Sequence, residues 1–527
     1  MCRAALSLTL LAVLVVFAAG CQRRGPSPNV EGAARDVLVV ASGIDAISLD
    51  PAVAYEFSST ALCMSFYDTL IRYENSDYTK PLPSLAARWK VSRDGLVYTF
   101  YLRPGLRFAS GRPLDAAAVR DSLVRTLRMN MAPAELLADN IAPERIRVVD
   151  PSTLEIRLAH PSAYFLSTLF NPAAGVVDSK EALAHEVEGD MGSGWLREHS
   201  AGSGPFTLKS WERDIAVVME RNENYWGTPP RLRRVIVKDV KESTTQKMMI
   251  ERGDVDVAYD MNPLQIEDAV ARSGRVRALE VPFLRLYYLG MNVKFGPLSD
   301  VRVRQAIRAA IRYDDLLAMG SGRQLRLRGP IIKGLVGFDP RLPGDYDPDR
   351  ARALLATAGY KDGFDVELAV SGGPTVFGPT REDICAKLQS DLAAVGIRVR
   401  IKTMSSTAYL ELYRGKKTQL NMGDWGADYP DPHNFAHPFG HSKGSLTQRV
   451  QYANLRLDPL IDKAGRELSP ARRAKLYAVI QRHLMMGGPW ATLLQPTRLL
   501  PVRVEVQGFR YDAQDPMDYR TVYKEPQ

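Results

Sequence analysis

Cysteine is scarce in this chain, with only four in 527 residues. None of them belongs to a Cys-x-x-Cys pair, so zinc ribbons and thioredoxin-like redox chemistry lack their ligands. Cys63 and Cys385 are far apart in the sequence, and each lies inside an apolar stretch. We therefore expect both to be buried free thiols.

The chain also lacks the common nucleotide and zinc-protease motifs, since it has no P-loop, no His-Glu-x-x-His and no Gly-x-Gly-x-x-Gly. One Gly-x-Ser-x-Gly is present at residues 440–444, but a nucleophile elbow needs a strand before the serine and a helix after it. The flanking residues 438–439 and 445–447 predict loops. A secreted hydrolase that uses Ser442, His433 or His437 is the competing hypothesis, and the sequence favours a protein that is not an enzyme.

Neither disorder nor a multispan membrane protein fits the composition, which is 45% hydrophobic and 24% charged residues. Basic residues exceed acidic ones by 69 to 60, a net charge of +9, but the two signs are interleaved along the chain. Interleaved charges keep a surface soluble, so we expect no nucleic-acid partner. Because a single core stops growing beyond about 250–300 residues, the length predicts two or more lobes.

The longest apolar run lies at the N-terminus. Residues 1–3 form a short basic start, and residues 4–19 are almost entirely apolar. A membrane-spanning helix needs roughly 20 apolar residues, so this shorter run predicts a secretory signal peptide over residues 1–20. The small residues directly before Cys21 resemble the lipobox of bacterial lipoproteins, in which this cysteine receives a lipid.

Residues 21–36 begin with a polar, proline-containing segment that predicts a flexible tether behind a lipidated Cys21. A plain leader cut after Ala18 is the alternative, because leucine is absent three residues before Cys21. In both cases the protein is exported. We expect it in the periplasm or on the outer face of the cell membrane, held there by an N-terminal lipid anchor.

A strand–helix–strand pattern occurs twice. Residues 235–240 and 255–259 predict strands on either side of a helix that Ser243 can cap and Gly253 ends. Later, Phe364, Val366, Leu368 and Val370 alternate as one face of a strand, a helical stripe runs from Ile384 to Val395, and residues 397–401 form the next strand. Each unit predicts a parallel crossover, so the chain reads as two α/β lobes.

Between these units, Ser299 and Asp300 predict the cap of a helix whose apolar stripe includes Val303, Ala306, Ile307, Ala310 and Ile311. Its arginines, Arg302, Arg304 and Arg308, are expected on a solvated face.

Two polar segments near residue 430 could carry a site. His433, His437 and His441 have a spacing that would align them on a helix and suit a transition metal, but Pro432 and Pro438 predict that this helix does not form. Residues 425–432, which contain Trp425, Gly426, Ala427, Asp428 and Tyr429, follow an apparent strand at residues 419–422. Small residues beside an indole and a carboxylate suit a ligand pocket, and a buried turn in which Asp428 caps backbone amides suits them equally.

Several separate motifs, in order, resemble the dipeptide- and oligopeptide-binding proteins of bacterial ABC importers, which are extracellular solute-binding proteins of family 5. The resemblance covers nearly the whole mature chain. It rests on residues 83–89, 94–100 and 102–105 near the N-terminus, on residues 204–206 and 221–227 in the middle, and on residues 291–292 and 300–307 after them.

The resemblance implies an α/β fold of the two-lobed, type II periplasmic-binding-protein kind, with mixed sheets flanked by helices and two crossover segments near residues 281–292 and 489–501. Lobe I would contain residues 37–283 and 490–527, with an inserted subdomain over about residues 61–200, and lobe II residues 284–489. The ligand would lie between the lobes. The implied partners are a short peptide, an ABC permease and its ATPase subunits; we expect a monomer without cofactor or metal.

The family's aspartate that pairs with a peptide's ammonium falls on Asp428, and Trp425 then lines the pocket. An enclosed ammonium must be paired with charge, which agrees with a carboxylate there. Tyr55, Glu56 and Phe57 occupy the matching place in lobe I.

The chain departs from the family at the other end of the ligand. Dipeptide-specific members carry an arginine before the helix of lobe II, whereas residues 372–378 here contain no basic residue. The next one is Arg381, which we include among the candidate binding residues, and the group that binds the ligand's carboxylate stays unassigned. A metal chelate of the nickel type, or another non-peptide solute, is the alternative ligand. Nickel-binding relatives use a downstream histidine that His441 could imitate. They have proline in place of Asp428, so peptide is favoured.

Overall fold

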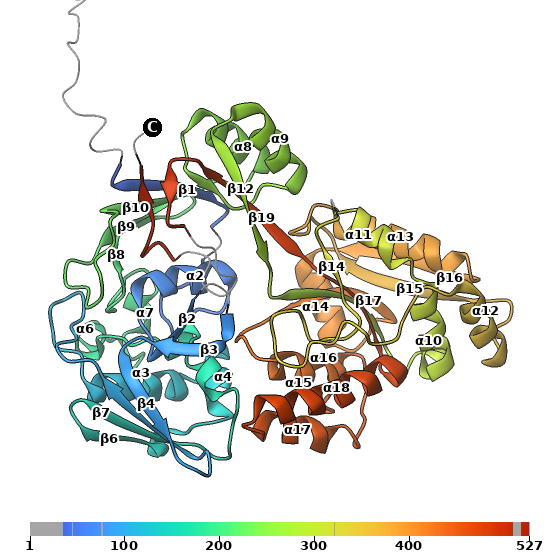
Figure 1. The fold of residues 1–527 in the computed structure, drawn as a ribbon, viewed down its shortest axis with the longest axis horizontal. Helices are drawn as coiled ribbons and strands as arrows, with labels where there is room; N and C mark the ends of the chain where they lie inside the picture. The colour runs from blue at the N-terminus through green and yellow to red at the C-terminus, as the bar shows by residue number, and fades with distance from the viewer. Residues whose placement is uncertain (1–34, 45, 75–76, 321, 510–517, 526–527) are drawn as a thin grey trace, which may run out of the picture.

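The computed structural model describes residues 35–44, 46–74, 77–320, 322–509 and 518–525, and shows two lobes side by side (Figure 1). The predicted signal peptide, Cys21 and nearly all of the predicted tether lie outside the described residues. Each lobe is built on its own mixed sheet with helices packed around it, so the predicted two-lobed α/β architecture is confirmed.

Lobe I contains a seven-stranded sheet in the order β12-β19-β11-β1-β10-β9-β8. Central β1 is parallel to both β10 and β11, while β9 and β19 pair antiparallel to their neighbours. The strands are β1 (Val37–Ser42), β8 (Phe206–Glu212), β9 (Ala216–Arg221), β10 (Arg234–Asp239), β11 (Val257–Ala258), β12 (Val276–Pro282) and β19 (Thr497–Arg503).

A smaller part of lobe I carries the four-stranded antiparallel sheet β4-β5-β7-β6 and the hairpin β2-β3. In Figure 1 it occupies the lower left, with α3 against the sheet. The elements are β2 (Ile71–Glu74), β3 (Asp77–Pro83), β4 (Ala86–Val91), β5 (Val97–Leu102), α3 (Ala116–Met129), β6 (Ile146–Asp150) and β7 (Thr153–Arg157). A short pair, β20 (Val506–Gln507) and β21 (Tyr523–Lys524), completes the described strands of lobe I.

Lobe II contains the six-stranded sheet β14-β18-β13-β17-β15-β16. Its strands are β13 (Arg285–Met291), β14 (Leu325–Arg326), β15 (Phe364–Ser371), β16 (Ile397–Met404), β17 (Leu420–Gly426) and β18 (Trp490–Gln495). Strands β15 and β16 are parallel neighbours, joined through α13 (Arg381–Ala393), as the second strand–helix–strand pattern predicts.

The helices of lobe I are α2 (Phe57–Phe66), α4 (Glu135–Ala138), α5 (Phe165–Thr168), α6 (Ser179–Leu183), α7 (Ser193–Leu196), α8 (Ser243–Arg252) and α9 (Pro263–Ser273), besides α3. Those of lobe II, besides α13, are α10 (Val301–Ala310), α11 (Tyr313–Ala318), α12 (Pro348–Thr357), α14 (Ser406–Arg414), α15 (His433–Gly440), α16 (Ser445–Arg449), α17 (Asp458–Arg466) and α18 (Pro470–Gly487). No helix of the described residues is long and apolar enough to cross a membrane.

The first strand–helix–strand pattern is confirmed, with two differences. Strands β10 and β11 are parallel but have β1 between them, so the crossover skips one strand. The prediction that Ser243 caps α8 is wrong, because the N-cap is Glu242 and Ser243 is the first helical residue. Gly253 ends the helix in the left-handed conformation, with φ of 86°, as expected of a C-terminal glycine.

Two short connections join the lobes. Residues 283–284 connect β12 to β13, and residue 496 connects β18 to β19. The two crossings are bonded to each other, since Phe283 N–H donates to the Pro496 carbonyl at 3.2 Å and Gln495 Nε2 donates to the Phe283 carbonyl at 3.0 Å. Both lie inside the predicted crossover segments. In Figure 1, β12 and β19 run together from the top of lobe I toward lobe II.

The predicted solvated face of α10 is wrong for two of its arginines. Arg304 and Arg308 are buried, whereas Arg302 is exposed. Arg304 donates to the carbonyls of Leu298, Ser299 and Gly487, and Arg308 donates to those of Gly488 and Trp490. Carbonyls at the end of α18 have no partner in their own helix, so these guanidiniums satisfy them and fix α18 against α10.

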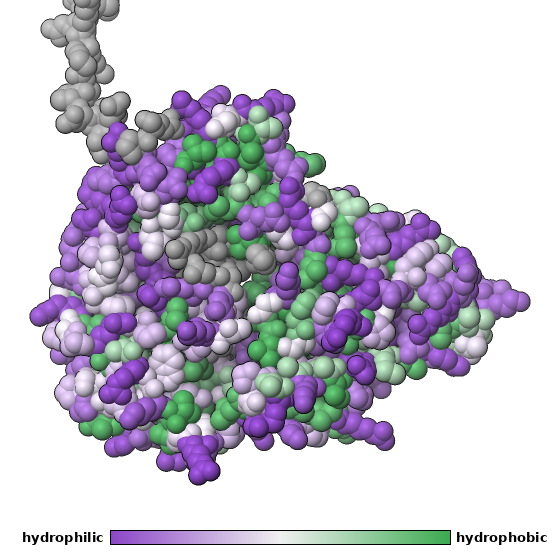
Figure 2. Space-filling view, in the orientation of Figure 1, coloured by the Kyte–Doolittle hydropathy of each residue, from purple (hydrophilic) through white to green (hydrophobic). Residues whose placement is uncertain are grey.

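The cysteine prediction is confirmed, since Cys63 and Cys385 are both free and buried. Burial raises the pKa of the Cys385 thiol to about 12 and that of Cys63 well above its usual value, which leaves both thiols protonated and unreactive. Hydrophilic residues spread over both outer sides of the molecule in the view of Figure 2, in line with the interleaved charges of the sequence.

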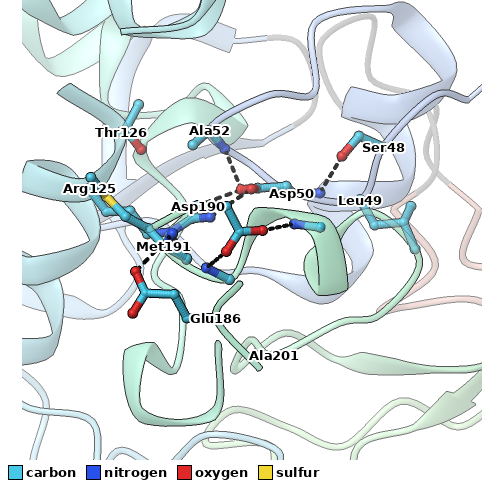
Figure 3. A network of polar contacts seen from close by, with 12 residues as sticks. Ser48, Leu49, Asp50, Ala52, Arg125, Thr126, Glu186, Asp190, Met191 and Ala201 are labelled. Atoms are coloured by element: carbon cyan, nitrogen blue, oxygen red, sulfur yellow. Dashed lines mark hydrogen bonds and ion pairs between the residues drawn. The ribbon is translucent and has the colours of Figure 1, made fainter. Parts of the chain in front are cut away.

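A buried ion pair fixes the chain segment that leads to Tyr55. Arg125 of α3 donates to both carboxylate oxygens of Asp50 at 2.7 Å, and the amide of Ala52 donates to the same carboxylate at 3.0 Å (Figure 3). The side chain of Asp50 is fully buried and that of Arg125 is 7% exposed. The amides of Val53 and Ala54 donate to the Asp50 carbonyl, which turns the chain toward Tyr55.

We predict that Arg125→Met destabilises the protein by about 3–5 kcal/mol, because it leaves the Asp50 carboxylate buried without a cation. Urea unfolding followed by circular dichroism measures the change. The matched control is Arg120→Met on the same helix, whose pair with Asp121 is 40% and 46% exposed and contributes about 0–1 kcal/mol. Equal losses for the two variants would contradict the assignment.

Candidate functional site

The candidate site is a cavity of about 660 Å³ between the two lobes. Lobe I contributes Tyr55, Tyr164 and the region of α4, and lobe II contributes residues of β17, α14, α15 and α16. The volume lies within the roughly 300–1,000 Å³ typical of small-molecule sites. Because the wall comes from both lobes, an occupant of this cavity would contact both.

A larger cavity, of about 990 Å³, lies within lobe I and is lined by residues from 72–74, 87–106, 225–231 and 518–523. It contains none of the predicted site residues, and no residue of lobe II takes part in its wall. The interlobe cavity is therefore the better candidate.

Asp428 joins the two lobes at one end of the interlobe cavity. Its main chain is held by two amide side chains: Asn171 Nδ2 of lobe I donates to the Asp428 carbonyl at 2.9 Å, and the Asp428 amide donates to Asn434 Oδ1 at 3.0 Å. Its carboxylate accepts from Tyr55 Oη of lobe I and from Asn434 Nδ2, each at 3.4 Å. The alternative, a buried turn in which Asp428 caps backbone amides, does not fit this geometry, because neither of the described donors to its carboxylate is a backbone N–H.

The carboxylate of Asp428 is poorly compensated. Contacts of 3.4 Å are long for hydrogen bonds, and neither of its donors among the described residues is cationic. Burial raises the pKa of Asp428, the charge of Glu135 adds to the rise, and the bonds from Asn434 and Tyr55 oppose it. Such a group gains stability when a cation from a ligand enters, since an ammonium supplies both charge and hydrogen bonds.

Trp425 is hydrogen-bonded to helix α15, which Pro432 and Pro438 were expected to prevent. The chain is helical over His433–Gly440, with Pro432 at the N-cap and Pro438 inside, so the prediction of a broken segment is wrong. Pro432 is tolerated because the first turn needs no donor there. Pro438 lacks the N–H that would bond to the Asn434 carbonyl, and the indole Nε1 of Trp425 donates to that carbonyl instead, at 2.9 Å.

The rings of the three histidines lie next to one another along α15 and its C-cap, and only those of His437 and His441 are stacked. His433 lies 4.4 Å from the ring of Tyr164, and His437 lies 4.7 Å from His441, measured between ring centroids. Burial, followed by the charge of His437, lowers the pKa of His433 well below its usual value, so this ring is neutral. Within the described part of the chain, no group of three or more His, Cys, Asp or Glu is placed to hold a metal ion.

Ser442 does not sit on a nucleophile elbow, because helix α15 and not a strand precedes it. Its hydroxyl donates to Asp458, whose carboxylate also accepts the Ser442 amide. The segment after it is helix α16, where a loop is predicted from the sequence. The serine holds α17 in place and has no histidine as hydrogen-bond partner among the described contacts.

A charge cluster that sequence reasoning missed contributes Asp424 and Arg381 to the wall of the same cavity. Asp424 forms ion pairs with Arg285 of β13 and, at 3.2 Å, with Arg381 of α13. Burial alone would raise the pKa of Asp424, but the two guanidiniums hold it below its usual range. The one feature of the sequence that could have pointed to this cluster was the position of Asp424 next to Trp425. Arg285 is far away in the sequence and comes close to Asp424 only because β13 pairs with β17.

Five of the predicted residues line the cavity: Tyr55, Arg381, Trp425, Asp428 and Tyr429. Glu56, Phe57, Gly426 and Ala427 lie outside its lining. Glu56 is the N-cap of α2 and Phe57 is its first residue, 42% exposed. The strand predicted to end at Met422 runs on through Gly426, which pairs with Arg285.

A two-lobed α/β fold with a charged cavity between the lobes is the architecture of a type II periplasmic binding protein. The structure superposes with a TM-score of 0.78 on the periplasmic binding protein of an ABC transporter from Helicobacter pylori, solved with the peptide STSA. The two chains share 25% identity, over 93% of this chain and 98% of that one.

The chain belongs to the bacterial extracellular solute-binding proteins, family 5, whose model matches residues 80–447. It is 30% identical to the probable D,D-dipeptide-binding periplasmic protein of Escherichia coli K12, over 91% of this chain and 92% of that protein. It is also 30% identical to the glutathione-binding protein of Salmonella paratyphi A, over 88% of this chain and 89% of that protein. The resemblance given by the sequence motifs is confirmed.

We predict that Trp425→Phe costs about 1–3 kcal/mol of stability, because it leaves the Asn434 carbonyl without a donor. Pro438→Ala restores a backbone N–H at the position from which the helix normally supplies that bond. The double variant should therefore lose less than the sum of the two single changes, by about 1 kcal/mol. Thermal unfolding of all three variants measures this coupling, and strictly additive losses would contradict the proposed exchange of donors.

Proposed function

We propose that this protein is the extracytoplasmic receptor of an ABC importer, which captures short peptides between its lobes and delivers them to a membrane permease. The observation that carries the proposal is the half-buried carboxylate of Asp428. It lies at the lobe interface with two long hydrogen bonds from neutral donors, and no cation pairs with it in the part of the chain that the structure describes. A peptide's α-ammonium would supply the missing positive charge.

The relatives support this ligand class. One is named for a D,D-dipeptide and one for glutathione, and the Helicobacter pylori structure contains a peptide. All three ligands are peptides or peptide-like. A metal chelate as ligand lacks comparable support, because Asp428 provides an acidic group where an ammonium would bind.

The tyrosine-rich wall of the cavity suits a peptide whose sequence varies. Tyr164, Tyr288, Tyr409, Tyr413 and Tyr429 all contribute to its lining. Their rings give broad apolar contact, and their hydroxyls can meet backbone groups directly or through water. Specificity for the ligand would then lie in its charged ends more than in its side chains.

The division of the chain follows the two sheets. We propose that residues 37–283 and 490–527 move as lobe I, with the inserted subdomain over about residues 61–200, and residues 284–489 as lobe II. The support is that the chain crosses between the sheets at residues 283–284 and 496, close to these limits.

The protein is proposed to act outside the cytoplasm as a monomer, held at the membrane by a lipid on Cys21 after removal of residues 1–20. Membership in an extracellular solute-binding family supports export. We propose no catalytic role for it, since transport energy would come from the ATPase subunits of the importer.

Asp428→Asn should weaken peptide binding at least about 30-fold, because a buried carboxylate–ammonium pair is lost. Isothermal calorimetry with a mixture of Ala-Xaa-Ala tripeptides measures the affinity. The wild-type protein should lose as much affinity for the N-acetylated mixture. The Asp428→Asn variant should bind the acetylated mixture no more weakly than it binds the free one. Unchanged affinity in the variant would contradict the assignment of Asp428 as the partner of the peptide's ammonium.

The empty Asp428→Asn protein should be at least as stable as the wild type at neutral pH. Because the folded-state pKa of Asp428 lies above its unfolded value, ionisation at this position lowers stability as the pH rises from the unfolded towards the folded pKa. The thermal midpoint at pH 7, measured without peptide, distinguishes this from a variant that fails to bind because it fails to fold.

Peptide should also reduce the radius of gyration measured by small-angle X-ray scattering. The lobes contact each other through Asn171 and Tyr55 on Asp428, and through Ala163 N–H on the Gly465 carbonyl at 2.9 Å. A ligand that contacts both lobes favours the state in which these contacts form. The Asp428→Asn protein serves as the control, and its radius should not respond to peptide. An equal radius for filled and empty wild-type protein would argue against closure.

A further inference from the structure

The cavity of about 990 Å³ within lobe I, called the lobe I cavity below, has no part in the proposed function. Its wall comes from β2, β4, the segment after β5, the loop between β9 and β10, and the residues that lead into β21. Two of the motifs found in the sequence, residues 102–105 and 221–227, contribute to this wall and not to that of the interlobe cavity. The volume suits a small organic molecule, for which sites of about 300–1,000 Å³ are typical.

The lining of the lobe I cavity carries more positive than negative charge. Its described charged residues are four arginines and two carboxylic acids: Arg72, Arg103, Arg231, Arg520, Glu74 and Asp518. Arg72 pairs with Glu74 at 2.7 Å, and Arg520 pairs with Asp518 at 2.6 Å. Each carboxylate of the lining therefore already has a cation, and two arginines remain.

Arg103 is held in the wall by a fixed aromatic ring. Its Nε donates to the Ser84 carbonyl at 2.7 Å, and its guanidinium carbon lies 5.0 Å from the ring centroid of Trp226. The indole is fixed in turn, because its Nε1 donates to the buried carboxylate of Asp68 at 2.7 Å. Among the described residues, no Asp or Glu pairs with Arg103, and the terminal nitrogens of its guanidinium have no hydrogen-bond partner.

Arg231 makes the same kind of contact. Its guanidinium carbon lies 3.8 Å from the ring centroid of Tyr523, and its side chain forms no hydrogen bond or ion pair with the part of the chain that the structure describes. Arg231 is exposed, whereas Arg103 is half-buried. Stacking on a ring restricts the plane of a guanidinium and leaves the N–H groups at its edge available to a ligand.

Arg103 and Arg231 thus bring two positive charges, without a described counter-charge, to the wall of one cavity. Like charges in one site repel each other, and an anion that contacts both removes this cost. The planar fork of a guanidinium matches the oxygens of a phosphate group, which it binds through two parallel hydrogen bonds. A phosphate monoester carries a charge of about −1.5 to −2 at pH 7, which matches two arginines.

The rest of the lining suits the organic part of such an ester. Tyr73, Leu106, Tyr225 and Pro229 contribute aromatic and apolar surface to the same wall. Aromatic rings give a ligand broad apolar contact, while the hydroxyls of tyrosines can bond to its polar groups.

The lobe I cavity also lies beside the start of β1. Lys524, the residue after Tyr523, donates from Nζ to the Val37 carbonyl at 3.0 Å. The amide of Arg233, two residues after Arg231, donates to the Asp36 carbonyl at 2.7 Å. The predicted tether ends at residue 36, so the phosphate of a lipid headgroup and that of a soluble ester are both within reach of this wall.

We propose that the lobe I cavity is a second ligand site, which binds a phosphate monoester through Arg103 and Arg231. The site goes beyond the proposed function and does not depend on it, because no residue of lobe II takes part in its wall. Its occupant is the phosphate of a soluble ester or of a lipid headgroup, and the experiment distinguishes the two sources.

The test measures binding of glycerol 3-phosphate by isothermal calorimetry. Wild-type protein should bind it, and uncharged glycerol should give no heat of binding. Arg103→Gln and Arg231→Gln should each weaken the affinity about 10- to 100-fold, the range expected when a hydrogen-bonded charge pair is lost. Arg103→Lys should fall between wild type and Arg103→Gln, because lysine keeps the charge and loses the fork.

Arg213→Gln is the matched control. Arg213 also stacks on an aromatic ring, that of Trp211 at 3.6 Å, but it pairs with Glu198 at 3.1 Å and lies outside the lobe I cavity. Its loss should leave the affinity for glycerol 3-phosphate unchanged. Thermal midpoints of all variants, measured without ligand, confirm that each is folded, so the result does not depend on whether the protein binds peptide.

Sedimentation with vesicles separates the two sources of the phosphate. A lipid headgroup is the ligand if wild-type protein binds phosphatidic acid vesicles more strongly than phosphatidylcholine vesicles, and if Arg103→Gln and Arg231→Gln abolish that excess. A soluble ester is the ligand if glycerol 3-phosphate binds and the two kinds of vesicle are bound equally. The proposal is overturned if wild type binds neither glycerol 3-phosphate nor phosphatidic acid vesicles in excess, or if both arginine variants bind as wild type does.

Discussion

The arrangement of this molecule depends on how the chain passes between its two sheets. It crosses through residues 283–284 and 496, and hydrogen bonds tie one crossing to the other. Strands β12 and β19 pair along seven residues before they leave lobe I, and β13 and β18 pair after they enter lobe II. Each lobe is thus stiff up to the crossing, and freedom to rotate is concentrated in very few backbone torsions.

Because only two short connections join the lobes, the contacts between the lobes decide how they are held together. Tyr55 is positioned by the turn at Asp50, which the buried Arg125 holds, and Asp428 is positioned by Asn434 at the start of α15. Each side of the cavity is therefore rigidly built on its own lobe. The carboxylate of Asp428 is one of the points at which the two lobes meet, and its long hydrogen bonds from neutral donors leave it short of a positive charge.

Much of the fold could be predicted because local patterns and tertiary structure agree. The alternation in Phe364–Ser371 and the stripe in α13 match a parallel unit that needs no distant information. Two of the failures share a cause, which is a hydrogen-bond partner outside the helix concerned. Arg304 and Arg308 are buried because α18 brings free carbonyls to them. Helix α15 survives Pro438 because Trp425 supplies the missing donor. No periodicity in α10 or α15 contains that information.

The same reasoning applies to the site. A carboxylate beside an indole is visible in the sequence, so Asp428 and Trp425 could be singled out. The Asp424–Arg285–Arg381 cluster could not, since strand pairing and a helix start bring those charges together.

The hydrogen-bond partners of Asp428 come from both lobes, and this has a consequence for the release of a bound ligand. Tyr55 and Asn171 belong to lobe I, while Asp428 and Asn434 belong to lobe II. When the lobes part, water replaces Tyr55 at the carboxylate, and the dielectric around it rises. A charge pair that is strong in the closed cavity becomes an ordinary solvated pair. A permease that separated the lobes would thereby lower the affinity for the ligand without contacting the ligand itself.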